Sequence, residues 1–432
     1  MGRARANIAS TVKKSQARAN RIVPVLLILF WEGYGVKKII LVAICCILCS
    51  ATLTAAAEGT ALRTVSCFAG LDASSSTYTR LLAQWEEQTG NTVQDSSAPS
   101  DEAWKTGVLM DFAAGNEPDV LFFFSRTADS AYLLNRVVPI AEINAAYPDL
   151  HIPENPACTE ADGKIYAVPV RSYWEGLFCN VDLFTAYDVE LPTTWDKLTA
   201  AIKAFRRNGI VPISVSLSDV PHYLAEFALL AACTPDEYAA RPAAGQPAPE
   251  SWVVGMGLIH SLFELGAFPD NVNTTDENYT SQLFRDKRSA MQLDGSWFAN
   301  SLPVGSIDNT VVLPFPAARD GAGGVLGGVS MGFYLTRRAW EDERKRDAAV
   351  HLLAYLATGE NAHTLGGFQF TGRLLQSAAE LTGQTLYTPV QDQMSQEARN
   401  EWFRLIPAVA TGALAPEALW AQVMALNPFA VE

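Results

Sequence analysis

Residues 112–124, FAAGNEPDVLFFF, carry the chain from the end of one helix into a buried strand. Gly115 is predicted to stop the helix, as glycine often does at a helix end. The apolar run 119–124 is typical of a parallel strand that is covered on both faces. Ser100 is predicted to cap the helix, whose apolar positions are Trp104, Val108, Leu109 and Phe112.

The preceding residues repeat the same alternation. Residues 64–68 (TVSCF) predict a short buried strand, and residues 91–93 begin another. Between them, apolar residues recur at helical spacing and Gly90 follows as a stop; they are Tyr78, Leu81, Leu82 and Trp85. The order strand, helix, strand, helix, strand predicts an α/β sheet with right-handed crossovers.

The pattern continues along the chain. Strands are predicted at 165–170, 176–179, 211–215, 290–293, 311–315 and 329–335, and helices at 194–205, 252–265, 347–356 and from 398 onward. No internal repeat interrupts this alternation. The length of 432 residues suits two or three domains.

Charge is divided unevenly along the chain. The net charge is −14, yet residues 1–57 hold eight Lys or Arg and one acid. The acidic body argues against binding nucleic acid, which requires an excess of cations. A basic N-terminus ahead of an acidic body is typical of an exported protein.

An export segment is predicted at 1–57. Lys37 and Lys38 precede the apolar run 39–53, and small residues follow, so we expect cleavage after Ala57. An uncleaved membrane anchor remains open, although the run is short for a bilayer. A lipid anchor on Cys49 also remains open, although the bulky Leu48 does not suit the cleavage position, and the true start of translation is open too. Four cysteines lie beyond this segment, and disulfides and free thiols are both compatible with them; they are Cys67, Cys158, Cys179 and Cys233.

Several motifs occur in an order that resembles one family. They include residues 112–120, GKIYAVP at 163–169, LPTTWDKL at 191–198, AMQLDGSW at 290–297 and the glycine-rich strand 327–335. Over about residues 60–375 the chain resembles the extracellular solute-binding proteins of ABC importers, in particular the sugar-binding family that includes maltose-binding protein. Cys179 stands where that family usually has tyrosine.

The resemblance implies an α/β fold of the periplasmic-binding-protein type, with two lobes, a hinge and a ligand cleft between the lobes. We expect the first lobe to comprise 62–168 and 300–360. The second lobe is expected to comprise 169–299 and 361–432. The protein would then be an extracytoplasmic, cell-surface or periplasmic monomer without a cofactor.

A sugar site needs aromatic plates for the C–H faces of the ring and planar polar groups for its hydroxyls. By resemblance, Trp297 is the first candidate for a stacking plate. Tyr173, Trp174 and Glu175 form an aromatic and acidic turn just before a predicted hinge strand. Core packing is the alternative for each aromatic residue.

Further candidates lie at the ends of predicted strands and the starts of helices, where ligands of open α/β sheets bind. These candidates are Asp72, Ser74, Glu102, Phe124, Ser125, Asp294, Gly328 and Arg373. Helix capping, core packing or a plain surface position is the alternative for each. No metal-binding spacing occurs among the five histidines.

The preferred hypothesis is capture of a sugar or oligosaccharide and its delivery to ABC permease subunits, without catalysis. A second hypothesis keeps the fold but changes the solute to a peptide, a polyamine or an anion, or makes the protein a ligand sensor. A third is a secreted serine hydrolase, because GVSMG at 328–332 fits the nucleophile motif G-x-S-x-G, with Asp347 and His363 downstream. That motif requires a helix directly after Ser330, whereas the sequence predicts a strand there.

Overall fold

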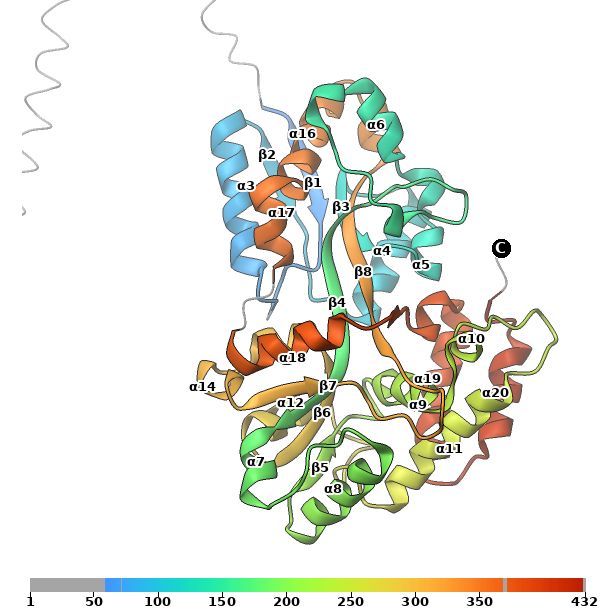
Figure 1. Cartoon of the computed structure of the whole chain (residues 1–432). Helices are drawn as coiled ribbons and strands as arrows, with labels where there is room; N and C mark the ends of the chain where they lie inside the picture. Colours follow the sequence, from blue (N-terminus) through green and yellow to red (C-terminus); the bar gives the residue numbers. More distant parts are fainter. Residues whose placement is uncertain (1–58, 71, 368–370, 430–432) are drawn as a thin grey trace, which may run out of the picture. The chain divides into compact units, whose positions relative to one another are not determined.

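Two long strands, β4 (Val168–Asn180) and β8 (Val325–Leu335), run side by side through both lobes of the molecule (Figure 1). The computed structural model describes residues 59–70, 72–367 and 371–429. The chain divides into two units between Gly59 and Thr60, and both lobes belong to the second unit. The expected export segment lies outside the described residues. None of the helices in the described ranges is long and apolar enough to cross a membrane.

The sheet has the order β2-β1-β3-β8-β4-β6-β5, with β7 beside β4 and β9 beside β8. Its other strands are β1 (Ala61–Val65), β2 (Thr92–Asp95), β3 (Val120–Phe124), β5 (Val211–Ser214), β6 (Ser289–Gly295), β7 (Thr310–Leu313) and β9 (Leu386–Tyr387). β1 pairs in parallel with β2 and β3, as the alternating sequence pattern predicts. β8 returns antiparallel to both β3 and β4.

Helices cover the sheet in both lobes. The longer ones are α3 (Ser75–Thr89), α4 (Glu102–Ala114), α8 (Trp195–Arg207), α9 (Pro221–Ala232), α11 (Glu250–Glu264), α12 (Glu277–Arg285), α16 (Arg346–Ala357), α17 (Gly359–Gly366), α18 (Gly372–Thr382), α19 (Gln396–Ala410) and α20 (Pro416–Ala425). Short helical turns near the site are α5 (Ala128–Ala131), α13 (Ser296–Ser301) and η4 (Val390–Gln393). α4 is capped by Asp101, whose side chain accepts the Trp104 N–H, and not by Ser100 as predicted.

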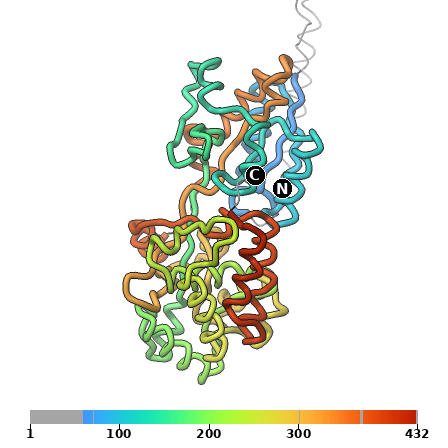
Figure 2. The backbone as a smooth tube through the Cα atoms, turned by 90° about the vertical axis from the view of Figure 1, so that its right-hand side faces the viewer, coloured from blue at the N-terminus to red at the C-terminus, as the bar shows by residue number. Residues whose placement is uncertain are grey.

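Separate hydrophobic cores define the two lobes. The first is built around β1 and β3, α3, α4 and α16. The second lobe holds a large core around α8, α9, α11, α19 and α20 and a smaller one around Trp174 and Phe178. In Figure 2 the C-terminal helices α19 and α20 run along the second lobe. Burial of these apolar faces, at about 25 cal/mol per Å², is the main stabilising contribution to each lobe.

The lobe boundaries differ in two places from those expected. Leu302 and Val312 were expected in the first lobe but pack in the small core of the second. The reason is that β7 pairs with the far end of β4 and so extends the sheet of the second lobe. Leu365 was expected in the second lobe but packs in the core of the first, because α17 lies against α3.

The hinge region lies in the middle of β4 and β8. β4 shifts register around Arg171, where the regular ladder with β8 is interrupted. Gly327 and Gly328 stand opposite Trp174 and Tyr173. A Cβ at Gly327 would lie 2.7 Å from the Tyr173 carbonyl oxygen, and Gly328 has a φ of +146° that other residues rarely adopt. The two glycines therefore permit the close approach of the strands at the crossing.

The four cysteines of the described residues are free, buried thiols. The disulfide alternative left open by the sequence is therefore not the one realised in this structure.

Candidate functional site

The two faces of β4 separate the predicted aromatic turn into a buried part and a part that faces the other lobe. Trp174 is 3% exposed and packs on Phe178, with ring centroids 5.7 Å apart. Side chains alternate along a strand, so Tyr173 and Glu175 share the opposite face. The Tyr173 ring stacks on Trp297, with centroids 6.2 Å apart. The geometry favours Tyr173 and Glu175, but not Trp174, as ligand-facing residues.

Trp297 lies at the start of α13, directly after strand β6, and is 42% exposed. Its ring also lies 6.0 Å from that of Tyr223 on α9. A Cβ at Gly295 would lie 2.3 Å from the Trp297 ring, so the indole folds back over Gly295 and would have to move if a larger residue stood there. Three aromatic rings thus adjoin one another, and the central one remains accessible to solvent.

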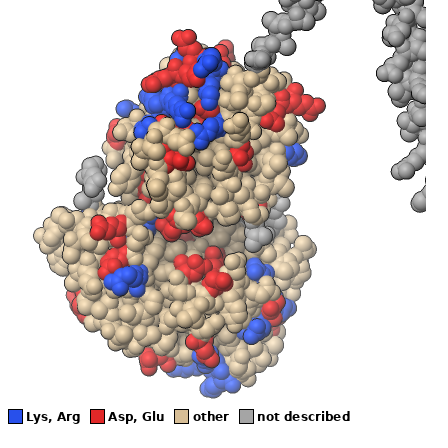
Figure 3. Space-filling view, turned by 180° about the vertical axis from the view of Figure 1, so that it is seen from behind, with Lys and Arg blue, Asp and Glu red and all other residues tan. Residues whose placement is uncertain are grey.

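Four carboxylates gather beside these rings; we call Glu175, Glu226, Asp294 and Asp392 the acidic cluster. Glu175 pairs across the sheet with Gly295, the residue after Asp294. Glu226 on α9 accepts the backbone N–H of Gln391 at 2.8 Å, which brings the neighbouring Asp392 of η4 to the same place. In Figure 3 acidic side chains are visible where the two lobes adjoin.

Burial is the largest cause that raises the pKa of every member of the acidic cluster, and nearby acids add to it. Burial, then Asp392, Glu226 and Asp294, hold the pKa of Glu175 well above its usual range. Burial raises the pKa of Glu226 to about 7 and that of Asp392 to about 6. Burial and the nearby Glu277 likewise raise the pKa of Asp294, although its oxygens accept hydrogen bonds from Gln292 and from the Gly295 N–H.

A second group of charges joins the two lobes and is balanced; we call Glu102, Lys105, Asp129 and Arg399 the balanced cluster. Arg399 of α19 is 2% exposed and contacts Asp129 at 2.9 Å and Glu102 at 3.2 Å. Lys105 contacts the other Glu102 oxygen at 2.6 Å. Burial would raise the pKa of Glu102, but Lys105 and Arg399 outweigh it and the pKa is lowered.

Two neutral hydrogen bonds supplement the balanced cluster. Gln393 donates through Nε2 to the carbonyl of Arg126 at 2.8 Å. Gln396 donates through Nε2 to the Thr106 hydroxyl at 3.0 Å. The contact between the lobes is thus made by η4 and the start of α19 on one side and by α4 and α5 on the other.

Asp72 and Ser74 occupy structural positions in the first lobe. Asp72 forms a two-point ion pair with Arg171, at 2.7 and 3.1 Å. The Ser74 hydroxyl donates to the Leu365 carbonyl at 2.9 Å and so ties α3 to α17. Their polar groups are engaged within the protein.

Phe124 and Ser125, at the end of β3, differ in their burial and in their surroundings. Phe124 is partly exposed, and the Lys105 ammonium lies 4.9 Å from its ring centroid. Ser125 is buried, with its hydroxyl 4.0 Å from the Cys158 sulfur. Phe124 therefore adjoins the balanced cluster, whereas Ser125 points into the core.

The last two candidates for ligand binding, Gly328 and Arg373, lie in different surroundings. Gly328 lies directly opposite Tyr173 at the hinge. Arg373 is exposed near the start of α18 and has no hydrogen bond or ion pair within the described ranges.

Ser330, the nucleophile of the hydrolase hypothesis, lies in the middle of β8, and its carbonyl accepts the Ser125 N–H. A nucleophile elbow needs a strand-to-helix turn at the serine, and β8 continues for five more residues.

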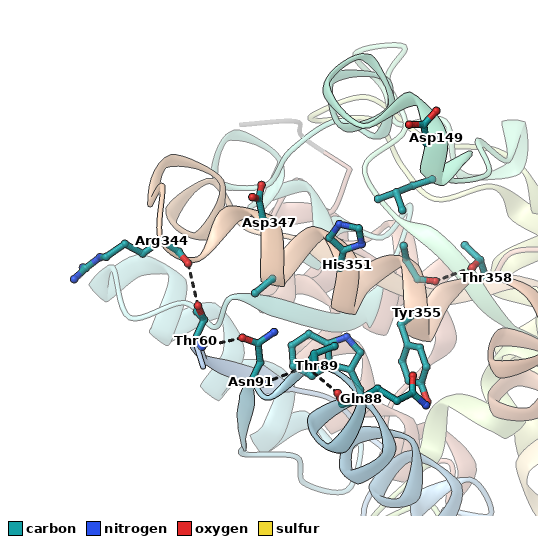
Figure 4. Close-up of a pocket in the computed structure, with 14 residues that line it drawn as sticks. Thr60, Gln88, Thr89, Asn91, Asp149, Arg344, Asp347, His351, Tyr355 and Thr358 are labelled. Carbon is teal, nitrogen blue, oxygen red and sulfur yellow. Dashed lines mark hydrogen bonds between the residues drawn. The ribbon is translucent and has the colours of Figure 1, made fainter. Parts of the chain in front are cut away.

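A surface hollow of about 760 Å³ lies elsewhere, on the first lobe alone (Figure 4). Gln88 and Thr89 at the end of α3 line one side, and Asp347 and His351 of α16 line another. A ligand there would contact one lobe only. It would therefore make no contacts that differ between open and closed arrangements, and could not drive closure.

A comparison with protein-family models assigns the chain to a family that is consistent with the two-lobed fold. The model of the bacterial extracellular solute-binding proteins matches residues 69–362, more than half of the chain. The chain belongs to this family. No curated protein sequence matches it significantly.

Solved structures share the fold of this solute-binding protein. A chitin oligosaccharide binding protein has 18% identity and a TM-score of 0.70, covering 82% of this chain and 94% of its own. Maltose-bound MalE3 of T. maritima has 16% identity and a TM-score of 0.66, with coverage of 85% and 98%. The GacH receptor of Streptomyces glaucescens, solved also with acarbose, has 18% identity and a TM-score of 0.66, with coverage of 85% and 97%.

Sequence reasoning missed several residues of the candidate site of this solute-binding protein. Glu226 is the one acid in the otherwise apolar helix α9, and a lone acid among buried positions was a readable signal. Tyr223 lies on the same helix, three residues earlier. Asp392 and Arg399 carried no such signal, because only the fold brings η4 and α19 to the other lobe.

Proposed function

We propose that this solute-binding protein captures a sugar or oligosaccharide between its lobes and delivers it to the permease subunits of an ABC transporter. The observation that carries the proposal is the exposed Trp297 ring beside Tyr173 and a row of carboxylates. A pyranose ring presents a C–H face to such a plate and hydroxyls to such acids. The similar solved structures, which include a chitin oligosaccharide binding protein, maltose-bound MalE3 and the GacH receptor with acarbose, support the same class of solute.

Closure between the lobes supplies the mechanism. Tyr173 and Glu175 lie on β4 and Asp294 lies on β6. Turn η4 packs against α5 of the first lobe and against α9 of the second. A solute that touches both sides stabilises the closed arrangement by its difference in affinity for the two states. We propose that the protein acts as a monomer outside the membrane, held there or released through residues 1–57, and that it does not alter its solute chemically.

A thermal-shift panel tests the proposal. The purified protein is heated with monosaccharides, oligosaccharides, amino acids, peptides and polyamines. A solute at about 100 times its Kd adds about 2.7 kcal/mol to the free energy of unfolding, which gives a measurable rise in Tm. A rise with saccharides supports the proposal. A rise confined to another class, or none at all, contradicts it.

A pair of variants ties the binding to the site. Trp297→Ala should weaken saccharide binding by at least tenfold, because the stacking plate is removed. Tyr187→Ala removes another exposed aromatic ring, on the far side of the second lobe, and should leave the affinity unchanged. Equal losses in both variants would show that Trp297 is not a ligand contact.

A further inference from the structure

The acidic cluster has an excess of negative charge that the protein itself does not neutralise. The groups that act electrostatically on Glu175 are Asp392, Glu226 and Asp294, all of them acids. Lys105 and Arg399 reach Asp392 but are themselves occupied by Glu102 and Asp129. The cations that reach the cluster act on Asp392 (Lys105 and Arg399) and on Glu226 (Arg241), and none of them is among the groups that act on Glu175.

Glu175 supplies a second, independent observation. Its side chain is 5% exposed and makes no hydrogen bond within the described ranges, although its oxygens are not among the fully buried unpaired atoms there. Buried polar groups are nearly always hydrogen-bonded, so a carboxylate shielded to this extent favours a ligand that donates a hydrogen bond to it. Glu175 also lies on the strand face of Tyr173, whose ring adjoins the exposed Trp297. The unpaired carboxylate thus faces the place where the solute is proposed to lie.

The geometry is not that of a metal site. Among the described residues no group of three or more His, Cys, Asp or Glu is arranged to hold a metal ion. The rings of Tyr173, Trp297 and Tyr223 add faces that attract an organic cation. An ammonium group fits both features, since it donates up to three charge-assisted hydrogen bonds and lies favourably against an aromatic face.

We propose that the solute is a saccharide that carries a protonated amino group, and that Glu175 and Asp392 bind this group beside Tyr173. The inference rests on the proposed function and narrows its substrate class. An N-acetylated sugar lacks the positive charge, so it would leave the carboxylates unpaired. A neutral sugar would have to bind them in their protonated form.

Titration calorimetry on the full protein tests the proposal with three probes of equal length: glucosamine oligomers, their N-acetylated counterparts and neutral gluco-oligosaccharides. Glucosamine oligomers should bind at least tenfold more tightly than either of the others near neutral pH. If neutral or N-acetylated sugars bind equally well or better, the inference is overturned while the proposed function stands. If no saccharide binds and a polyamine does, both fail.

The sign of the pH dependence gives a second test. The groups that face Glu175 are Asp294 on β6, Glu226 and Tyr223 on α9, Asp392 on η4 and Tyr173 on β4. Glu277 on α12 acts on Asp294, and Tyr238 and Arg241 act on Glu226. Asp392 also faces the balanced cluster, whose members are Glu102, Lys105, Asp129 and Arg399. Binding of an ammonium needs these carboxylates ionised, so the affinity should rise from pH 5 to pH 7. Neutral-sugar binding should fall or stay constant over the same range. An affinity for glucosamine oligomers that falls as pH rises would overturn the proposal.

Two variants complete the experiment. Glu175→Gln keeps the shape but removes the charge, and should weaken glucosamine-oligomer binding at least tenfold while changing neutral-sugar binding less than threefold. Glu401→Gln, at a surface pair with Arg404, is the matched control and should change neither. An equal loss for charged and neutral sugars in Glu175→Gln would assign Glu175 to general hydroxyl binding and refute the inference.

Discussion

The two charge clusters between the lobes have opposite designs. The balanced cluster pairs each buried acid with a cation, so Asp129 and Arg399 satisfy each other at 2.9 Å. In the acidic cluster, burial chiefly raises the pKa values of Glu175 and Glu226, and nearby acids raise them further. A buried charge is tolerated when it is paired and is costly when it is not.

This difference suggests that one cluster holds the lobes together and that the other binds the solute. The balanced cluster is complete without a solute and holds α19 against α4 and α5. The acidic cluster stores unfavourable electrostatic energy at the proposed binding place, which a cation would release. Strained or unpaired groups of this kind are characteristic of functional sites, where stability is sacrificed for binding.

The largest effect is expected from breaking the balanced cluster. Arg399→Met leaves Asp129 and Glu102 without their buried partner, and should lower the free energy of unfolding by about 3–5 kcal/mol in urea titrations. Arg404→Met removes an arginine from the same helix whose pair with Glu401 is largely exposed, and should cost less than about 1 kcal/mol.

Small-angle scattering reports on the lobes in the same variants. If the balanced cluster holds the closed arrangement, Arg399→Met should increase the radius of gyration, and Arg404→Met should not. Equal stability and equal size of the two variants would show that the cluster does not hold the lobes together.

The acidic cluster should make the protein less stable as pH rises. The pKa values of Glu226 and Asp392 are about 7 and about 6 in the fold, above those of free carboxyls. The folded protein therefore binds protons that the unfolded chain releases. The resulting stability is present below about pH 4 and is lost as pH rises to about 7, by an amount on the order of 3 kcal/mol for each of the two groups.

Urea titrations between pH 4.5 and 8 measure this loss of stability. The variant Glu175→Gln provides a comparison with one carboxylate removed. The variant removes one repelling charge, so it should be more stable than the wild type at pH 8, by about 1 kcal/mol or more, and similar to it at pH 4.5. A wild-type protein whose stability rises across this range would contradict the assignment of raised pKa values to the cluster.

Much of the fold was predictable because its signals are local. The helix and strand periods around residues 64–124 produced β1, α3, α4 and β3 close to their predicted places. β4 was predicted as two strands, 165–170 and 176–179, because the polar residues between them hide its continuity. Only pairing with β8 keeps the strand extended through the register shift at Arg171.

The site was less predictable, for a different physical reason. Alternation along β4 was enough to separate Trp174 from Tyr173 and Glu175, once the strand was known to continue. Trp297 follows the motif after β6, and the sequence alone was enough to name it as a candidate. Asp392 and Arg399 come together with the first lobe through long-range packing of the C-terminal helices, which no local pattern encodes.

The smallest expected effect probes the link between the clusters. Lys105 pairs with the partly exposed Glu102 and also lowers the pKa of Asp392. Lys105→Met should therefore cost less than about 1 kcal/mol in urea, because Arg399 still compensates Glu102. It should also move the pH-dependent loss of stability to higher pH, since Asp392 loses a cation that favours its ionised form.

Measurements at several salt concentrations distinguish the electrostatic effect of Lys105 on Asp392 from the loss of packing of its side chain over Phe124. An electrostatic effect on Asp392 should shrink as ionic strength rises, whereas a packing effect should persist. Glu397→Gln, which alters an exposed charge in the first turn of α19, is the control and should leave the pH profile in place. A pH profile of Lys105→Met that matches the wild type at low salt would mean that the two clusters act independently, and that solute charge is recognised by the acidic cluster alone.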